Sequence, residues 1–458
     1  MKIVIIGCGK VGYTLAEQLS REDHDIVVVD ENKRMLEEAQ ETLDIMTVDG
    51  NGASLEVLRD AGTADADVLI ATTSADEINL LCCISAKKLG CRHTIARVRN
   101  PQYTQQIAFL KDELGLSLSV NPEQAAAQEI FKIIQIPSFL KRDSFYKGRV
   151  ELVELKLSEG GRLDGKRIMD AAKLLGLRVL ICAVERDGKV FIPNGRFELK
   201  GGDRITVTAA RSLLAKLIRN LDLEHQKIRG VMIIGCSRVA DYLTEDLIKS
   251  GVDVKVIEKD AEKCRQFSIN YPEAIVINGD ASKRGFLESQ GLESVDAVIT
   301  LTGIDEENLI TSIYANHLGV TKTVTKVDRN EYARLFDDQI GSIVCPKDLT
   351  SNEILRYIRA MGNSGKGTVK ALHRIVDGKA EALEFAVAAP APFLGIPLSK
   401  LNIKPSTLIA CICRSNQIII PKGDDELRLG DTLIVVTGAE QSYGDLNDIF
   451  EKEAVKQQ

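Results

Sequence analysis

Long hydrophobic runs are absent from this sequence, and their absence excludes a chain that crosses a membrane by itself. The longest apolar stretch, residues 385–398, is too short and is interrupted by Pro390, Pro392 and Pro397, whereas a helical span needs about 20 apolar residues. The N-terminal run MKIVIIGCGKVG has no cleavage-like end and is typical of a strand. We therefore expect a cytoplasmic protein that is peripheral to the membrane when a partner holds it there.

Histidine is also scarce, and the cysteines do not form motifs. The chain has five histidines and ten cysteines, with no C-x-x-C and no histidine at zinc-like spacing from a cysteine. We predict reduced, mostly buried thiols and no metal site. Redox sensing by Cys8, which lies beside a glycine motif, is the alternative.

An excess of positive charge is missing as well. The 59 basic and 66 acidic side chains leave a net charge of −7, which argues against a nucleic-acid partner because such binders need a basic face. The apolar fraction of 44% and the charged fraction of 27% are those of ordinary globular chains. A length of 458 residues suggests several domains.

The chain does contain an internal duplication with a period of about half its length. GCGKVGYTLAEQL, which starts at Gly7, returns 228 residues later as GCSRVADYLTEDL, which starts at Gly235. IPNGRFELKGGD, which ends at Asp203, returns at the same offset as IPKGDDELRLGD, which ends at Asp431. The order of the units is therefore A–B–A′–B′.

The two kinds of unit have different patterns. In the first A unit, apolar strands over residues 2–7 and 26–30 enclose a helical pattern over 12–21, which predicts a parallel, doubly wound sheet. The first B unit alternates polar and apolar residues, with a hairpin turn at Asp187–Gly188. We predict that each B unit is a small α+β module.

A glycine motif opens the first A unit. It follows a strand, begins a helix and is followed about 20 residues later by an acidic strand end, Asp30, as in the dinucleotide-binding fingerprint. The helix N-terminus would hold phosphates, and Asp30 would accept hydrogen bonds from ribose hydroxyls, favouring NAD(H) over NADP(H). The alternative is that the glycines serve close packing alone. The motif comprises Gly7, Cys8, Gly9, Lys10, Val11 and Gly12.

Other candidate ligand contacts follow the later strands of this sheet, where ligands of such folds gather. The hydroxyl groups after the fourth strand are interpreted as ribose or phosphate contacts, or as a helix cap. The residues after the third strand are an adenine contact or a simple turn, and those after the fifth neutralise phosphates or pair with carboxylates. These candidates are Thr72, Thr73 and Ser74; Asn51 and Gly52; and Arg97 and Val98, with Arg99 beside them.

The second copy of the glycine motif is eroded. Gly235-Cys236-Ser237-Arg238-Val239-Ala240 lacks the second and third glycines, and Ser237 places a side chain where a backbone would approach a pyrophosphate. Glu258 still offers a carboxylate for ribose, and Asp280 follows the third strand. A weaker nucleotide site, a different one, or none fits this pattern equally well.

The B units do not supply the groups that a dehydrogenase needs. The first has no histidine, and in the second His373 stands alone in a strand-like run, so no general acid or base is evident. A nucleotide-binding regulator is therefore favoured. The alternatives are an NAD-dependent oxidoreductase with an unrecognised active site, and a nucleotide-binding scaffold.

The A–B order resembles the RCK (KTN) domains that regulate potassium channels and transporters. Two such units in one chain resemble the peripheral nucleotide-binding subunits of bacterial Trk potassium uptake. The resemblance rests on GCGKVG with Asp30, the turn at 279–282, the DEINL and DEENL segments, and the IPxG…GD pattern of both B units. The departures are Asn51-Gly52, where the family usually has Gly-Asp, and the broken motif of the second half.

This resemblance implies tandem duplicated Rossmann-like RCK_N domains with parallel sheets (1–138 and 229–361), each followed by a small α+β RCK_C domain (142–224 and 366–453). It implies NAD or NADH as the ligand, with ATP and ADP as alternatives. It further implies a homo-oligomeric ring beneath a membrane-spanning Trk-type transporter subunit, gated by nucleotides. The helices near 122–134 and 346–358 would cross to a neighbouring domain; the alternative is that they pack within their own domain.

Overall fold

The computed structural model describes residues 1–455 except 23, 112, 137–138, 147, 222, 224–226, 330–335, 337–338, 363–368, 416, 439 and 442. The chain divides into two compact units. The first unit comprises Met1–Phe131 and Arg229–Ile358, and the second comprises Lys132–Ile228 and Arg359–Gln458. Three predicted domain boundaries, at residues 138, 224 and 366, lie outside the described residues.

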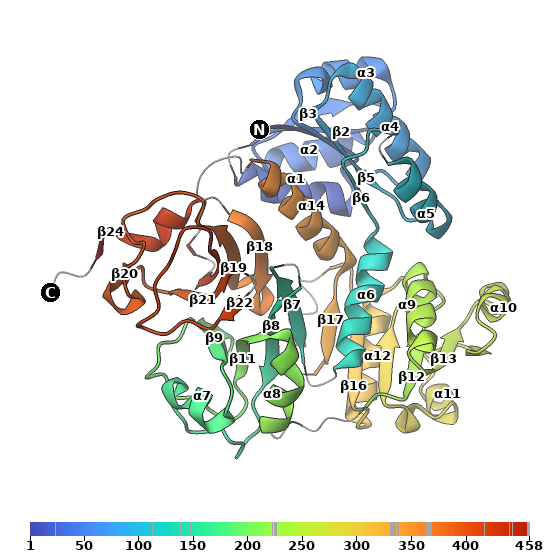
Figure 1. Ribbon diagram of the computed structural model, residues 1–458. Coiled ribbons are helices and arrows are strands. Elements are labelled where there is room, and N and C mark those ends of the chain that lie inside the picture. Colours follow the sequence, from blue (N-terminus) through green and yellow to red (C-terminus); the bar gives the residue numbers. More distant parts are fainter. Residues whose placement is uncertain are drawn as a thin grey trace. The chain divides into compact units, whose positions relative to one another are not determined.

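The first half of the first unit is a six-stranded parallel sheet in the order β3-β2-β1-β4-β5-β6. Its central strands are runs of buried β-branched residues, as parallel sheets covered on both faces require. Helices connect the strands and flank the sheet (Figure 1). The predicted doubly wound fold is confirmed. The elements are β1 (Lys2–Ile6), α1 (Lys10–Ser20), β2 (Asp25–Asp30), α2 (Lys33–Thr42), β3 (Met46–Asp49), α3 (Leu55–Asp60), β4 (Val68–Ala71), α4 (Asp76–Leu89), β5 (His93–Arg97), α5 (Pro101–Leu110), β6 (Leu118–Val120) and α6 (Pro122–Gln135).

The second half of this unit repeats the topology, with the order β14-β13-β12-β15-β16-β17. All of its described strand pairs are parallel. The duplication read from the sequence is therefore a duplication of folds. The elements are β12 (Gly230–Ile234), α9 (Arg238–Lys249), β13 (Asp253–Glu258), α10 (Ala261–Asn270), β14 (Ile275–Asn278), α11 (Arg284–Ser289), β15 (Ala297–Thr300), α12 (Asp305–His317), β16 (Lys322–Lys326), β17 (Ser342–Val344) and α14 (Pro346–Gly362).

The two halves of the first unit contact each other through the segments around α6 and α14. The Nδ2 of Asn121, just before α6, donates to the hydroxyl of Tyr242 in α9, at 2.9 Å. In the other direction, the ring of Tyr357 in α14 lies 6.3 Å from that of His93 at the start of β5. The helices that were expected to cross to a neighbouring domain therefore meet the other half of the same chain.

The second unit contains two antiparallel sheets, one from each B unit. Their orders are β10-β9-β11-β8-β7 and β18-β19-β23-β21-β22. The hairpin predicted at Asp187–Gly188 joins β9 to β10. The elements are β7 (Lys141–Phe145), β8 (Val150–Lys156), α7 (Ile168–Leu175), β9 (Leu180–Arg186), β10 (Lys189–Phe191), β11 (Arg204–Ala210), α8 (Leu214–Asn220), β18 (Val369–Ile375), β19 (Ala380–Ala386), β20 (Leu401–Ile403), β21 (Thr407–Arg414), β22 (Gln417–Ile419), β23 (Thr432–Gly438) and β24 (Phe450–Val455).

The two B sheets share one hydrophobic core. Phe145, Leu152 and Cys182 of the first sheet cluster with Ala382 and Cys411 of the second. Beside this core, Nδ1 of His373 lies 3.1 Å from a carboxylate oxygen of Asp143. His373 of the second B unit is thus paired with a carboxylate of the first B unit.

The cysteines behave as core residues. All ten are free, and nine are buried. Burial, with a smaller contribution from Asp30, raises the pKa of the Cys8 thiol to about 11, so the reactive thiolate is disfavoured at neutral pH. Within the described residues, no group of three or more acidic, histidine or cysteine side chains is placed to hold a metal, and no helix has the length and apolar character needed to cross a membrane.

Candidate functional site

Two of the three glycines in the first motif are constrained by the geometry of the first half. Gly7 has φ +97°, a conformation that residues with a side chain rarely adopt. A Cβ at Gly12 would lie 1.9 Å from the carbonyl oxygen of Gly7, so α1 could not pack as closely on the loop. These two positions agree with the packing interpretation.

Gly9 has no such role in the fold. Its backbone is extended, with φ −70° and ψ −173°, which any residue can adopt, and a Cβ placed there would meet nothing within 4 Å. Gly9 is also the N-cap of α1 and provides no side chain to bond the helix amides. The N-terminus of α1, with its unpaired N–H groups and partial positive charge, is therefore left accessible to a ligand.

Asp30 lies at the end of β2, directly beside this loop. One carboxylate oxygen accepts from the amide of Cys8 at 2.6 Å, and the other accepts from the amide of Asn32 at 2.8 Å. The carboxylate is partly exposed, and each oxygen can accept a further hydrogen bond. Asp30 thus anchors the glycine loop and can also meet a ribose.

The hydroxyl residues after β4 mainly support the loop. Thr72 is buried, and its hydroxyl donates to the carbonyl oxygens of Ile6 and Gly7, both at 3.2 Å. The hydroxyl of Thr73 bonds the Asn79 side chain at 2.8 Å. Ser74 is exposed, so its hydroxyl is the one of the three that a ligand reaches most readily.

The residues after β3 form a local turn. Asn51 accepts from the amide of Ala53 at 2.8 Å. A Cβ at Gly52 would lie 2.1 Å from a methyl carbon of Ile6. These contacts agree with the turn interpretation of both residues.

After β5, the side chains are held by protein groups. Arg97 donates to the carbonyl oxygen of Thr73, and its Nε is buried with no described partner. Burial, followed by the charge of Arg99, lowers the pKa of Arg97. Arg99 itself pairs with Glu123 at 2.6 Å, and Val98 is buried. The carboxylate-pairing alternative therefore applies to Arg99, whereas Arg97 retains an unused donor.

Lys10 has a partner that the sequence did not indicate. It is the first residue of α1, and its ammonium lies 2.9 Å from a carboxylate oxygen of Asp328, which follows β16 in the other half. Asp328 aligns with Arg99 in the duplication. Comparing the charges of the two copies position by position would have identified this reversal.

The second half repeats the loop anchor but not the open helix end. Glu258 accepts from the amides of Cys236 and Asp260 at 2.8 and 2.9 Å, as Asp30 does in the first half. The hydroxyl of Ser237 accepts from the amide of Ala240 at 3.4 Å and caps α9. In the second half, the Ser237 side chain therefore occupies the place that is left open beside Gly9 in the first half.

The second half nevertheless has a recess at the carboxyl ends of its parallel strands. Its volume is about 290 Å³, and Cys236, Ser237, Glu258 and Asp280 all line it. Asp280 also accepts from the amide and hydroxyl of Ser282. Lys259 and Lys263 add positive charge to the lining. The eroded motif therefore still borders a ligand-sized space.

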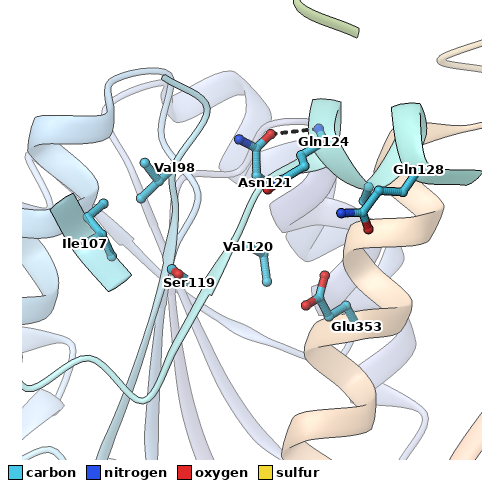
Figure 2. A pocket seen from close by; sticks show the side chains of 9 residues that line it. Val98, Ile107, Ser119, Val120, Asn121, Gln124, Gln128 and Glu353 are labelled. Atoms are coloured by element: carbon cyan, nitrogen blue, oxygen red, sulfur yellow. Dashed lines mark hydrogen bonds between the residues drawn. The ribbon is translucent and has the colours of Figure 1, made fainter. Parts of the chain in front are cut away.

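A further cavity of about 220 Å³ lies where α6 meets α14, and among the described residues that line it the charged one is Glu353 of the second half. Figure 2 shows Glu353 on α14 and Gln128 on α6, on facing helices. Burial raises the pKa of Glu353. No sequence motif indicated Glu353 as a candidate site residue. The lining residues are Val98, Ile107, Ser119, Val120, Asn121, Gln124, Ala125, Gln128 and Glu353.

Comparison with protein families identifies both kinds of unit. The TrkA-N domain model matches residues 3–122 and 231–346, and the TrkA-C domain model matches 152–222 and 382–443. The chain is 32% identical to the "Trk system potassium uptake protein TrkA homolog 2" of Methanosarcina mazei over 95% of this chain and 97% of that protein. It is 30% identical to the "Trk system potassium uptake protein TrkA" of Haemophilus influenzae over 99% of both.

Solved structures share the fold at low sequence identity. The crystal structure of the GsuK RCK domain has a TM-score of 0.62 at 19% identity and covers 96% of this chain and 92% of that chain. The structure described as "GsuK channel bound to NAD" has a TM-score of 0.61 at 19% identity, covering 96% of this chain and 77% of that chain. The tandem RCK architecture predicted from the sequence is therefore confirmed.

Proposed function

The chain belongs to the TrkA family of Trk system potassium uptake proteins, and we propose that it is a regulatory, non-enzymatic subunit that binds NAD or NADH in its first half. Relatives named as potassium uptake proteins match it over nearly their whole length. The proposed partner is a membrane-spanning Trk-type potassium transporter subunit, which would hold the chain at the cytoplasmic face of the membrane.

One observation carries the proposal of a nucleotide site. A Cβ at Gly9 would meet no described atom within 4 Å, and Gly9 offers no side chain to cap α1, so there is space for a ligand at this helix N-terminus. A helix N-terminus with open amides binds phosphate groups, and Asp30 lies beside it through its bond to Cys8. A pyrophosphate at the helix and a ribose at Asp30 is the arrangement of a dinucleotide in a Rossmann fold.

The preference for NAD(H) rests on Asp30, because a carboxylate attracts ribose hydroxyls and repels a 2′-phosphate. ATP and ADP remain alternative ligands, and related folds support both classes. One RCK-containing structure is described as bound to NAD, and another, with a TM-score of 0.51, as bound to ADP.

Assembly into a ring is supported by exposed apolar side chains at matching places in the duplication. Leu81 of α4 and Ile310 of α12 are 47% and 68% exposed, and Phe109 of α5 is 83% exposed. Large apolar groups on helix surfaces favour contact with other protein. We propose that these helices contact further copies of the chain, and that nucleotide binding shifts the ring between states for which the ligand has unequal affinity.

Calorimetric titration of the full chain with NAD+, NADH, ADP and ATP tests the nucleotide site. Asp30→Ala should abolish the binding of NADH or weaken it at least tenfold. Asp25→Ala is the matched control, since Asp25 is exposed at the opposite end of the same strand. Thermal unfolding of each variant is measured in parallel because Asp30 also anchors the loop. Absence of binding by all four nucleotides to the wild-type chain would refute the proposed function.

A further inference from the structure

At one aligned position near the phosphate ends of the two nucleotide sites, the facing halves carry opposite charges, Asp328 at the first site and Arg99 at the second. At the first, Lys10 is paired at 2.9 Å with Asp328. Asp328 is held in place, because its backbone amide donates to both carboxylate oxygens of Asp305 at 3.0 Å. A negative charge from the second half thus stands beside the first residue of α1, where the phosphates of a ligand would lie.

The second site has the same architecture with the charge reversed. Arg99 occupies the place of Asp328, and its amide donates to Asp76, the counterpart of Asp305, at 2.9 Å. Arg238 occupies the place of Lys10 at the start of α9. Tyr242, one helical turn later on the same face of α9, bonds Asn121 of the first half at 2.9 Å.

This face of α9 therefore lies against the end of β6, which is the neighbour of β5, and the arginines of the first half follow or end β5. Burial lowers the pKa of Arg97 most, and the charge of Arg99 lowers it further. The carboxylates of Glu123 and Asp76 raise this pKa, and the charge of Arg238 makes a smaller contribution that lowers it. Arg97 keeps a buried Nε without a described partner. At this aligned position the second site therefore faces an arginine, Arg99, which is paired with Glu123. The first site faces an acid, Asp328, which is paired with Lys10 and also lies 4.0 Å from Lys326.

We propose that Asp328 makes the first site select dinucleotides over nucleoside triphosphates, an inference that rests on the proposed nucleotide site. Each added phosphate increases the negative charge that Asp328 repels, and it competes with Asp328 for the ammonium of Lys10. The positive charge of the nicotinamide ring makes NAD+ the least repelled of the four nucleotides, and ATP is the most repelled.

Calorimetric titration of the full chain with NAD+, NADH, ADP and ATP tests this selectivity. Asp328→Asn keeps the shape of the side chain and removes its charge. Removing one charge at a distance of several ångströms in a partly solvated site should raise the affinity for ATP about five- to tenfold and the affinity for NAD+ by about twofold or less. The gain should disappear when Asp30→Ala is added, which assigns it to the first site.

Asp253→Asn is the matched control, because it removes the same charge from the amino end of β13, away from the ligand edge. The role of Asp328 would be overturned if Asp328→Asn changed the affinity for all four nucleotides equally. It would also be overturned if the wild type bound a nucleotide and Asp328→Asn changed no affinity. If the wild type binds none, the proposed function fails and this inference falls with it. Thermal unfolding shows whether each variant is folded.

Discussion

Gly9→Ser and Gly12→Ala should separate ligand binding from folding, because the two glycines have different surroundings. A side chain at Gly9 meets nothing within 4 Å, and Ser237 already occupies the matching place as the cap of α9. A serine N-cap is better than glycine by a few tenths of a kcal/mol. Gly9→Ser should therefore leave the free energy of unfolding unchanged or raise it by about 0.5 kcal/mol.

Gly12→Ala should have the opposite effect on stability. The new Cβ would lie 1.9 Å from the carbonyl oxygen of Gly7, so α1 must move by about 1 Å or more. Overpacking of this kind destabilises by about 1–3 kcal/mol. The loop is anchored to β2 and to Thr72, so it cannot simply retreat from the helix.

The assay combines urea unfolding with calorimetric titration of NADH on both variants. Gly9→Ser should lose nucleotide binding at full stability, because its side chain fills the approach to the helix amides. Wild-type affinity in Gly9→Ser would show that no phosphate approaches this position. A loss of stability in Gly9→Ser as large as that in Gly12→Ala would show that Gly9 too is a packing glycine.

Two carboxylates give pH-dependent predictions of opposite sign. Burial raises the pKa of Asp241 to about 6, so the ionisation of this carboxyl opposes folding increasingly as the pH rises from about 4 to about 6. In urea unfolding, Asp241→Asn should therefore raise the free energy of unfolding by about 1 kcal/mol at pH 7.5 and change it little at pH 4. Burial would raise the pKa of Asp143, but Lys141 and His373 lower it to about 2. The stability that the ionised Asp143 contributes is therefore present above about pH 4 and is lost as the pH falls toward 2. Asp143→Asn should lower the free energy of unfolding by about 2 kcal/mol at pH 7 and by clearly less at pH 3. An equal loss at both pH values would contradict the assignment of this stability to the Asp143 charge.

The fold could be predicted from the sequence because local patterns determine it. Buried β-branched strands such as 3–6 and 26–29 alternate with amphipathic helices, and the duplication supplies each pattern twice. The α+β modules followed from alternation and from the turn at Asp187–Gly188. These signals act within a few residues of the chain, and so they can be read from one sequence.

The contacts between the halves could not be predicted in the same way. The pair of Lys10 with Asp328 joins residues 318 positions apart, and the pair of Asp143 with His373 joins residues 230 apart. Both pairs depend on how two folded sheets meet. Glu353 was missed for the same reason, since its position opposite Gln128 depends on α14 packing against the first half.

The comparison of the two halves also changes which residue identifies a nucleotide site. Asp30 and Glu258 make the same bond to the amide after the first glycine, at 2.6 and 2.8 Å. An acid at this place therefore bonds the glycine loop in both halves, and its presence in the second half says little about a ligand. The two motifs differ at two glycines: Ala240 takes the place of Gly12, and Ser237 takes the place of Gly9, where the first half leaves the helix amides open and the second caps them. Gly9, rather than the acid, is therefore the residue on which our proposal of a nucleotide site in the first half rests.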